Sequence, residues 1–159
     1  MLLKEDENLL QKTLKALCIY FEKCKRGYQF ALYYGGKELV VNLIRMLTTE
    51  SSRKKLRENT ISIALRTVAD LSLGTSQPSG IMFKEGICEV MSVLLQSKVP
   101  AIEKDAAFAL ANIVAGRKNE VRLVREAGLH FILLTRMMST NASVLIEATI
   151  ALTNMVIAG

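Results

Sequence analysis

The chain has 159 residues, a length that fits one compact domain or a short array of repeats and excludes two large domains. Hydrophobic residues make up 50% and charged residues 23%, with 2 Pro and 9 Gly, which excludes disorder and a collagen-like chain and predicts a packed core. Charges interrupt each apolar run well before the roughly 20 residues that a membrane span requires, so we expect a soluble chain without membrane insertion.

Residue types that usually build catalytic or metal sites are scarce. The three cysteines, Cys18, Cys24 and Cys88, show no CxxC or His-paired spacing, and the chain has a single histidine, His130. Residues 4–7 are charged, where a secretory signal would place apolar residues. We predict a protein that is not an enzyme, has no cofactor or metal, and works in a reducing compartment, which is the cytoplasm or, as an alternative, the nucleus.

The first predicted element is a helix from Glu5 to Lys25, and it forms an incomplete unit at 1–27. Its apolar stripe is made of Leu9, Leu10, Leu14, Leu17 and Tyr20 or Phe21. The next unit, 28–80, has a short segment ending at Gly36, a helical run KELVVNLIRMLT, and a longer helix from residue 51 or 52 to Leu73. We expect residues 74–80, with their Gly, Ser and Pro, to form a loop.

Two further units of three helices each occupy 81–117 and 118–159. In the first, a short segment precedes Gly86, ICEVMSVLLQS follows, and a third helix runs from Lys98 to Gly116 with Pro100 at its entrance. In the second, NEVRLVREAG ends at Gly128, LHFILLTRMMST follows, and Asn141 or Ser143 can cap the third helix. That helix carries one charge between residues 144 and 157, so we expect it to be buried between neighbours.

Two markers recur along the chain in one phase. Ala-Leu pairs begin at Ala16, Ala64, Ala109 and Ala151, spaced by 48, 45 and 42 residues, which bracket the roughly 40 to 47 residues of HEAT and armadillo repeats. A glycine, at 36, 86 and 128, precedes a helical run in each unit. The agreement of the two markers predicts one continuous helical solenoid over 1–159.

The sequences FKEGICEVMSVLLQSKVPAIEKDAAFALANIVAG and VREAGLHFILLTRMMSTNASVLIEATIALTNMVIAG resemble armadillo repeats, in which a short helix, a glycine and two longer helices form one unit. HEAT repeats are the close rival, with two helices per unit. The resemblance implies an all-α fold, a right-handed α-α superhelix of about three repeats plus a leading helix. Its third helices would line a concave groove.

The resemblance also implies where a partner binds. In peptide-binding armadillo proteins resembling importin alpha, an Asn three residues after the Ala of the pair and a Trp just before that Ala form two ladders along the groove. The Asn position is kept at Asn112 and Asn154 and replaced by Thr67 and Ile19, whereas the Trp position is replaced throughout. We take as candidate partner-binding residues Asn112, Asn154, Phe108, Lys104, Thr67, Ile63, Asn59 and Lys15.

These residues predict an adaptor that binds a peptide or helix of a partner protein in the groove, because an Asn amide can pair with the N–H and C=O of an extended peptide. The ordinary alternatives are a bond from each Asn to its own helix and a core position for Phe108. The apolar last helix suggests a fragment of a longer protein, or a scaffold that self-associates through its ends. A nucleic-acid or acidic-lipid partner, suggested by the net charge of +6, is the remote alternative.

Overall fold

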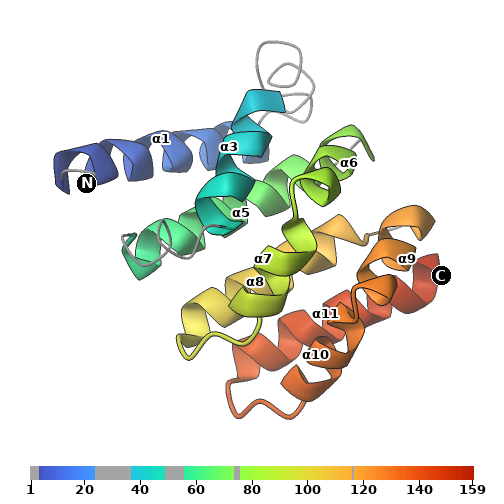
Figure 1. The fold of residues 1–159 in the computed structure, drawn as a ribbon. Helices are drawn as coiled ribbons and strands as arrows, with labels where there is room; N and C mark the ends of the chain where they lie inside the picture. The colour runs from blue at the N-terminus through green and yellow to red at the C-terminus, as the bar shows by residue number, and fades with distance from the viewer. Residues whose placement is uncertain (1–3, 24–36, 49–55, 74–75, 116) are drawn as a thin grey trace.

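The computed structural model describes residues 4–23, 37–48, 56–73, 76–115 and 117–159. These ranges contain helices and no strand, and the helices form two layers (Figure 1). In one layer four long helices lie side by side, each packed on the next. They are α1 (Lys4–Lys23), α5 (Glu58–Ser72), α8 (Pro100–Ile113) and α11 (Ala142–Ala158).

Shorter helices form the second layer and cover one side of the long ones. The helix α3 packs on α5, α7 on α8, and α10 on α11, while α6 and α9 precede α7 and α10 in their units. The second layer consists of α3 (Lys37–Thr48), α6 (Ser76–Lys84), α7 (Ile87–Leu94), α9 (Lys118–Glu126) and α10 (Leu129–Arg136). The predicted all-α stack of a leading helix and repeated helical units is confirmed.

Local sequence explains several of the helix ends. Pro100 is the first residue of α8, where the missing amide hydrogen costs no helical hydrogen bond. Asn141 caps α11, since its side chain accepts from the backbone N–H groups of Ser143 at 3.0 Å and Val144 at 3.2 Å. Gly86 and Gly128 have φ of 88° and 73° between the first and second helices of their units, a conformation that glycine adopts without steric cost.

Two predicted boundaries are corrected by the structure. The helix α6 begins at Ser76, inside the expected loop 74–80, so the unit boundary at 80/81 falls within a helix. Pro78 permits this because it lies in the first turn, whose amides have no helical partner. The helix α5 begins at Glu58 rather than at residue 51 or 52, after Arg57 in an extended conformation. The expected short helix before Gly36, and Cys24, lie outside the described residues.

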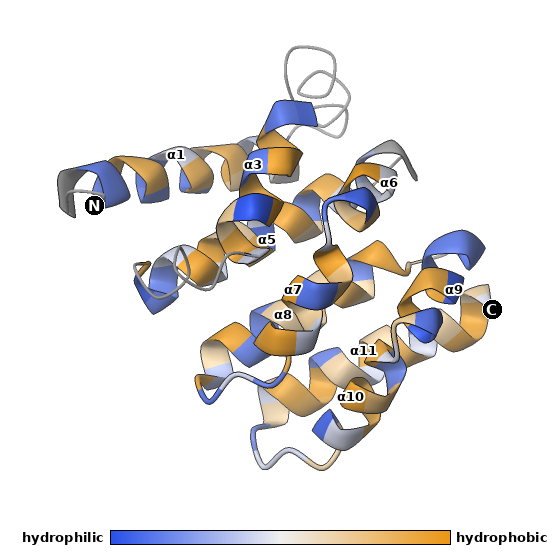
Figure 2. Ribbon diagram, in the orientation of Figure 1, coloured by the Kyte–Doolittle hydropathy of each residue, from blue (hydrophilic) through white to orange (hydrophobic). Residues whose placement is uncertain are grey.

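The core lies between the two layers and between successive long helices. Leu65, Leu110 and Leu129 are among its fully buried side chains. The expectation that α11 is buried between neighbours is wrong, although apolar residues do follow much of its length (Figure 2). Ile150 is 43% exposed and Val156 82% exposed, because α11 packs on α8 and the second layer while its remaining sides have no neighbour within the described residues.

Candidate functional site

The amides of Asn112 and Asn154 occupy equivalent positions on α8 and α11. Asn154 Nδ2 donates to the carbonyl oxygen of Ala111 at 3.0 Å, and Asn112 Nδ2 donates to that of Ala69 at 3.5 Å. Each bond spans 43 residues, so Asn154 contacts α8 as Asn112 contacts α5. Both side chains are half-buried. Among the described residues neither amide makes a further hydrogen bond, which leaves each with one N–H and its carbonyl oxygen for a ligand.

These bonds differ from the ordinary alternative that we considered. Each Asn bonds to the neighbouring long helix and not to its own. The bond fixes the amide relative to two successive repeats, because donor and acceptor come from different units. Two amides held in the same way on consecutive helices form a short row across the long-helix layer.

The Asn row belongs to a surface that we call the third-helix face. Residues three or four apart lie on the same side of a helix, and the positions of this face are all exposed or half-buried. On α8 the face consists of Ala101, Lys104, Phe108 and Asn112, with Ala115 in the turn that follows, and on α11 it consists of Ser143, Ile146, Ile150, Asn154 and Ile157. On α5 it consists of Asn59, Ser62, Arg66 and Asp70.

The structure changes the register of the predicted ladders on α5. Thr67 is fully buried and donates to the carbonyl oxygen of Ile63, itself 8% exposed, so neither side chain reaches the third-helix face. Asn112 lies 42 residues before Asn154 (154−112), and the residue 42 positions before Asn112 is Asp70 on α5. One helical turn before it, Arg66 takes the position of Phe108.

A sequence signal for this register exists but is weaker than the Ala-Leu pair. Asp70 stands as far before Gly74 as Asn112 stands before Gly116, and each is followed by an apolar residue. The other predicted positions on the early helices, Lys15 on α1 and Asn59 on α5, are exposed. Asn59 Nδ2 lies 3.5 Å from Gln11 Oε1 of α1.

A group of charged residues borders the apolar part of the face. Asp105 is 3% exposed, forms an ion pair with Lys104 Nζ at 2.9 Å, and accepts hydrogen bonds from Arg66 Nε at 3.4 Å and from the Ser62 hydroxyl. Burial raises the pKa of the nearby Glu147 carboxyl, which Lys104 and Arg66 partly oppose. Two cations thus share one buried carboxylate, and Arg66 keeps a side chain that is 57% exposed.

Phe108 combines the two roles considered for it, a core position and a place on the partner-binding face. It packs against the core cluster and is nevertheless half-buried rather than buried, so one side of the ring forms part of the third-helix face. Ile150, at the equivalent position of α11, is 43% exposed, and Ile146 is 54% exposed. Apolar side chains therefore lie one turn before the Asn row on both helices.

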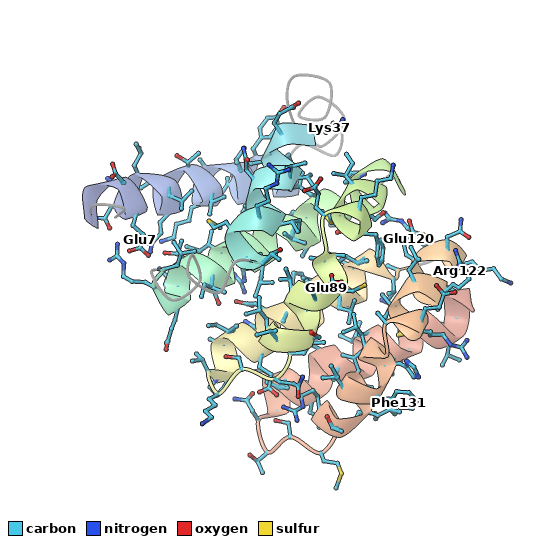
Figure 3. All side chains as sticks on the ribbon, in the orientation of Figure 1. Glu7, Lys37, Glu89, Glu120, Arg122 and Phe131 are labelled. Atoms are coloured by element: carbon cyan, nitrogen blue, oxygen red, sulfur yellow. The ribbon has the colours of Figure 1, made fainter. Side chains whose placement is uncertain are left out.

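Other features lie away from this face. Two hollows of about 440 and 280 Å³ lie beside α9 and the end of α11, and Arg125 and Gly159 line both. His130 lines the smaller one, its ring centroid 3.9 Å from that of Phe131, whose side chain is labelled in Figure 3. In the described ranges no group of three or more His, Cys, Asp or Glu could hold a metal ion. None of the helices there combines the length and apolar content needed to cross a membrane.

Comparisons with known proteins identify the fold. No protein-family model matches the sequence, and neither does any curated protein. Solved structures do match: an engineered protein from the Northeast Structural Genomics Consortium has a TM-score of 0.82 at 26% identity, over 99% of this chain and 60% of its own. A designed armadillo repeat protein in complex with the peptide (KR)4 has a TM-score of 0.80 at 22% identity, over 96% of this chain and 60% of its own.

The chain has an armadillo-repeat fold. A further match is a computationally designed armadillo repeat protein for modular peptide recognition, with a TM-score of 0.76 and 20% identity over 93% of this chain and 58% of its own. The chain thus spans about 60% of the length of these designed armadillo structures. In the armadillo arrangement α1, α5, α8 and α11 are the third helices, and each unit from 76 onward has the short first helix that we expected.

Proposed function

We propose that this armadillo chain is a non-catalytic interaction module that binds a segment of a partner protein across its third helices. The observation that carries the proposal is the pair Asn112 and Asn154, each held by a bond to the preceding third helix and each with unused hydrogen-bonding groups on the third-helix face. The designed armadillo neighbours support it, since one was solved with a peptide and another was designed for peptide recognition.

The chemistry of the amide favours an extended ligand. With one N–H bonded to the neighbouring helix, each Asn amide offers a ligand one donor and one acceptor at a fixed distance, which match the C=O and N–H of an extended main chain. In a helical ligand those groups already bond to each other within the helix. The amide row therefore binds main chain without selecting side chains, and selection falls to the neighbouring residues of the face.

The test is a selection of binders followed by matched substitutions. Peptides selected from a random library on the wild-type chain are measured by fluorescence anisotropy against Asn112→Ala/Asn154→Ala. We expect the double variant to lose at least tenfold in affinity. The control is Asn119→Ala, an exposed amide on α9 that lies off the third-helix face. Because each Asn also bonds to a neighbouring helix, a thermal melt first establishes that the double variant is folded at the temperature used.

Two results contradict the proposal. One is a library that yields no binder. The other is a set of binders whose affinity is the same for the wild type and the double variant, which places recognition on another surface.

A further inference from the structure

The third-helix face changes in polarity along the layer of long helices. On α5 the face carries the charges of Arg66 and Asp70. On α11 it carries three isoleucines, Ile146, Ile150 and Ile157, with exposures of 54%, 43% and 76%, and no charged residue. On α8 the half-buried ring of Phe108 continues this apolar area. One ligand lying across the layer therefore meets an apolar surface over α8 and α11.

The charges around this area disfavour a basic ligand. Lys104 is the one charged residue of the face on α8 and α11, and it is a cation. The carboxylate of Asp105 is buried, paired with Lys104, and hydrogen-bonded to Arg66 and Ser62. The positive charges of Lys104 and Arg66 also lower the pKa of the Glu147 carboxyl, against the effect of its burial. Over α8 and α11 a Lys- or Arg-rich segment would lose hydration and meet only the buried Asp105 and the half-buried Glu147, a carboxyl that already faces Lys104 and Arg66; the face's own carboxylate, Asp70, lies on α5.

We infer that the ligand of this face is an extended segment with uncharged apolar side chains at alternate positions, seated over Phe108, Ile146 and Ile150. This inference rests on the proposed function, because the Asn row supplies the main-chain contacts. Side chains alternate between the two sides of an extended chain, so every second residue faces the same surface. With its main chain on Asn112 and Asn154, such a segment sets alternate side chains against the apolar positions one helical turn away.

The exposed isoleucines supply the binding free energy in this picture. Removing apolar surface from water is favourable roughly in proportion to the area buried, and all three isoleucines are open to a ligand. The area is continuous with the Asn row on the same helix, since Ile146, Ile150 and Asn154 follow one another at intervals of one turn. The isoleucines themselves are neutral, and Lys104 is the cation of the face on α8 and α11 that would repel a basic ligand. The preference for an apolar over a basic ligand is therefore a difference in affinity that can be measured.

Two octapeptides of opposite chemistry test the inference on the whole chain. The probes are (LS)4, which places Leu on one side of an extended chain, and (KR)4. Each is titrated into ¹⁵N-labelled protein up to millimolar concentration, with the side-chain amides of Asn112 and Asn154 as reporters of the site. We expect (LS)4 to shift both amides and to bind at least tenfold more tightly than (KR)4.

A pair of variants on α11 locates the contact. Ile150→Lys adds a cation on the third-helix face, whereas Val156→Lys adds the same cation on another side of the same helix, at a side chain that is 82% exposed. We expect Ile150→Lys to weaken (LS)4 at least tenfold and Val156→Lys to leave it within twofold. Both positions are exposed, and a thermal melt of each variant checks that the fold is kept.

The outcomes separate the inference from the proposed function. Tighter binding of (KR)4, lost in Asn112→Ala/Asn154→Ala, overturns the apolar ligand and leaves the proposed function standing. Equal loss of (LS)4 in both lysine variants, or shifts confined to other residues, overturns the apolar site. Absence of binding by both octapeptides overturns the inference, whereas the proposed function fails only on one of the two results of the library experiment given above.

Discussion

Glu7 holds the leading helix on the first repeat, and its neutralisation should loosen α1. It lies on α1 beside the start of α5 (Figure 3), 7% exposed. Its Oε1 accepts from the backbone N–H of Arg57 and the hydroxyl of Thr60, both at 2.7 Å, and its Oε2 accepts from Arg57 Nε at 2.9 Å. The helix α5 has no cap from its own N-cap side chain, so this carboxylate supplies one from another helix.

The size of the effect follows from these contacts. The bond to the half-exposed guanidinium contributes little, as exposed ion pairs are worth about 0–1 kcal/mol. The two bonds to Oε1 are charge-assisted, and a neutral amide oxygen in Glu7→Gln makes bonds roughly half as strong, so we expect a loss of about 2 kcal/mol. At about 1.4 kcal/mol per tenfold, the backbone amides of α1 should exchange their hydrogens roughly thirtyfold faster in the variant at pH 7.

The pH dependence supplies a second test. The backbone N–H of Arg57, followed by the Thr60 hydroxyl, lowers the pKa of Glu7 from its ordinary 4.5. A carboxyl with a lowered folded-state pKa stabilises the fold above the unfolded pKa, and that contribution is lost as the pH falls through the folded value. The ratio of exchange rates between variant and wild type should therefore shrink below pH 4.5.

The control for Glu7→Gln is Glu58→Gln, which removes an exposed carboxylate from the first turn of α5. An exposed charge at a helix N-terminus contributes only about 0.3–1 kcal/mol, so its effect on α1 should be much smaller. Equal exchange of α1 in wild type and Glu7→Gln at pH 7 would refute the reasoning. So would a ratio that stays constant down to pH 3.

Two further expectations concern single residues. Gly128→Ala should lower the free energy of unfolding by about 1–2 kcal/mol, because φ is 73° at this position. Gly80→Ala should be neutral or stabilising, because Gly80 lies in helix α6 with open space around it. Urea melts in which the two variants have the same stability would contradict this expectation. Burial, followed by the charge of Glu89, raises the pKa of Cys88 from an ordinary 9.0 to about 11, leaving on the order of a hundredfold less thiolate at pH 8. Mapped alkylation of Cys88 should be slow until urea unfolds the chain, and rapid labelling of the folded chain would count against it.

Local features explain why much of the fold was predictable. The glycines at 86 and 128, Pro100 and the Asn141 cap act within a few residues of sequence, and the structure places a helix boundary at each. The start of α6 was missed because Pro78 and two glycines usually indicate a loop, yet proline in a first turn is compatible with a helix.

Sequence and structure agree on the register of the candidate site only on α8 and α11. On α8 and α11 the Ala-Leu pair stands in one register, and Asn112 and Asn154 make equivalent contacts. On α5 the same pair lies one turn earlier, and the sequence assigned the buried Thr67 and Ile63 in place of Asp70 and Arg66. The bond from Glu7 to the start of α5 was also missed, since its partners lie 50 and 53 residues away along the chain.

By itself the sequence determined the helical class, the repeating unit and the caps, because each depends on interactions between residues a few positions apart. The tertiary structure alone decided the register of α5 and the exposed sides of α11. An apolar stripe recurs every three or four residues, so a helix shifted by one turn presents nearly the same pattern. Only the contact with the neighbouring helix selects one register, and only the presence or absence of a neighbour decides which apolar side chains stay open to a partner.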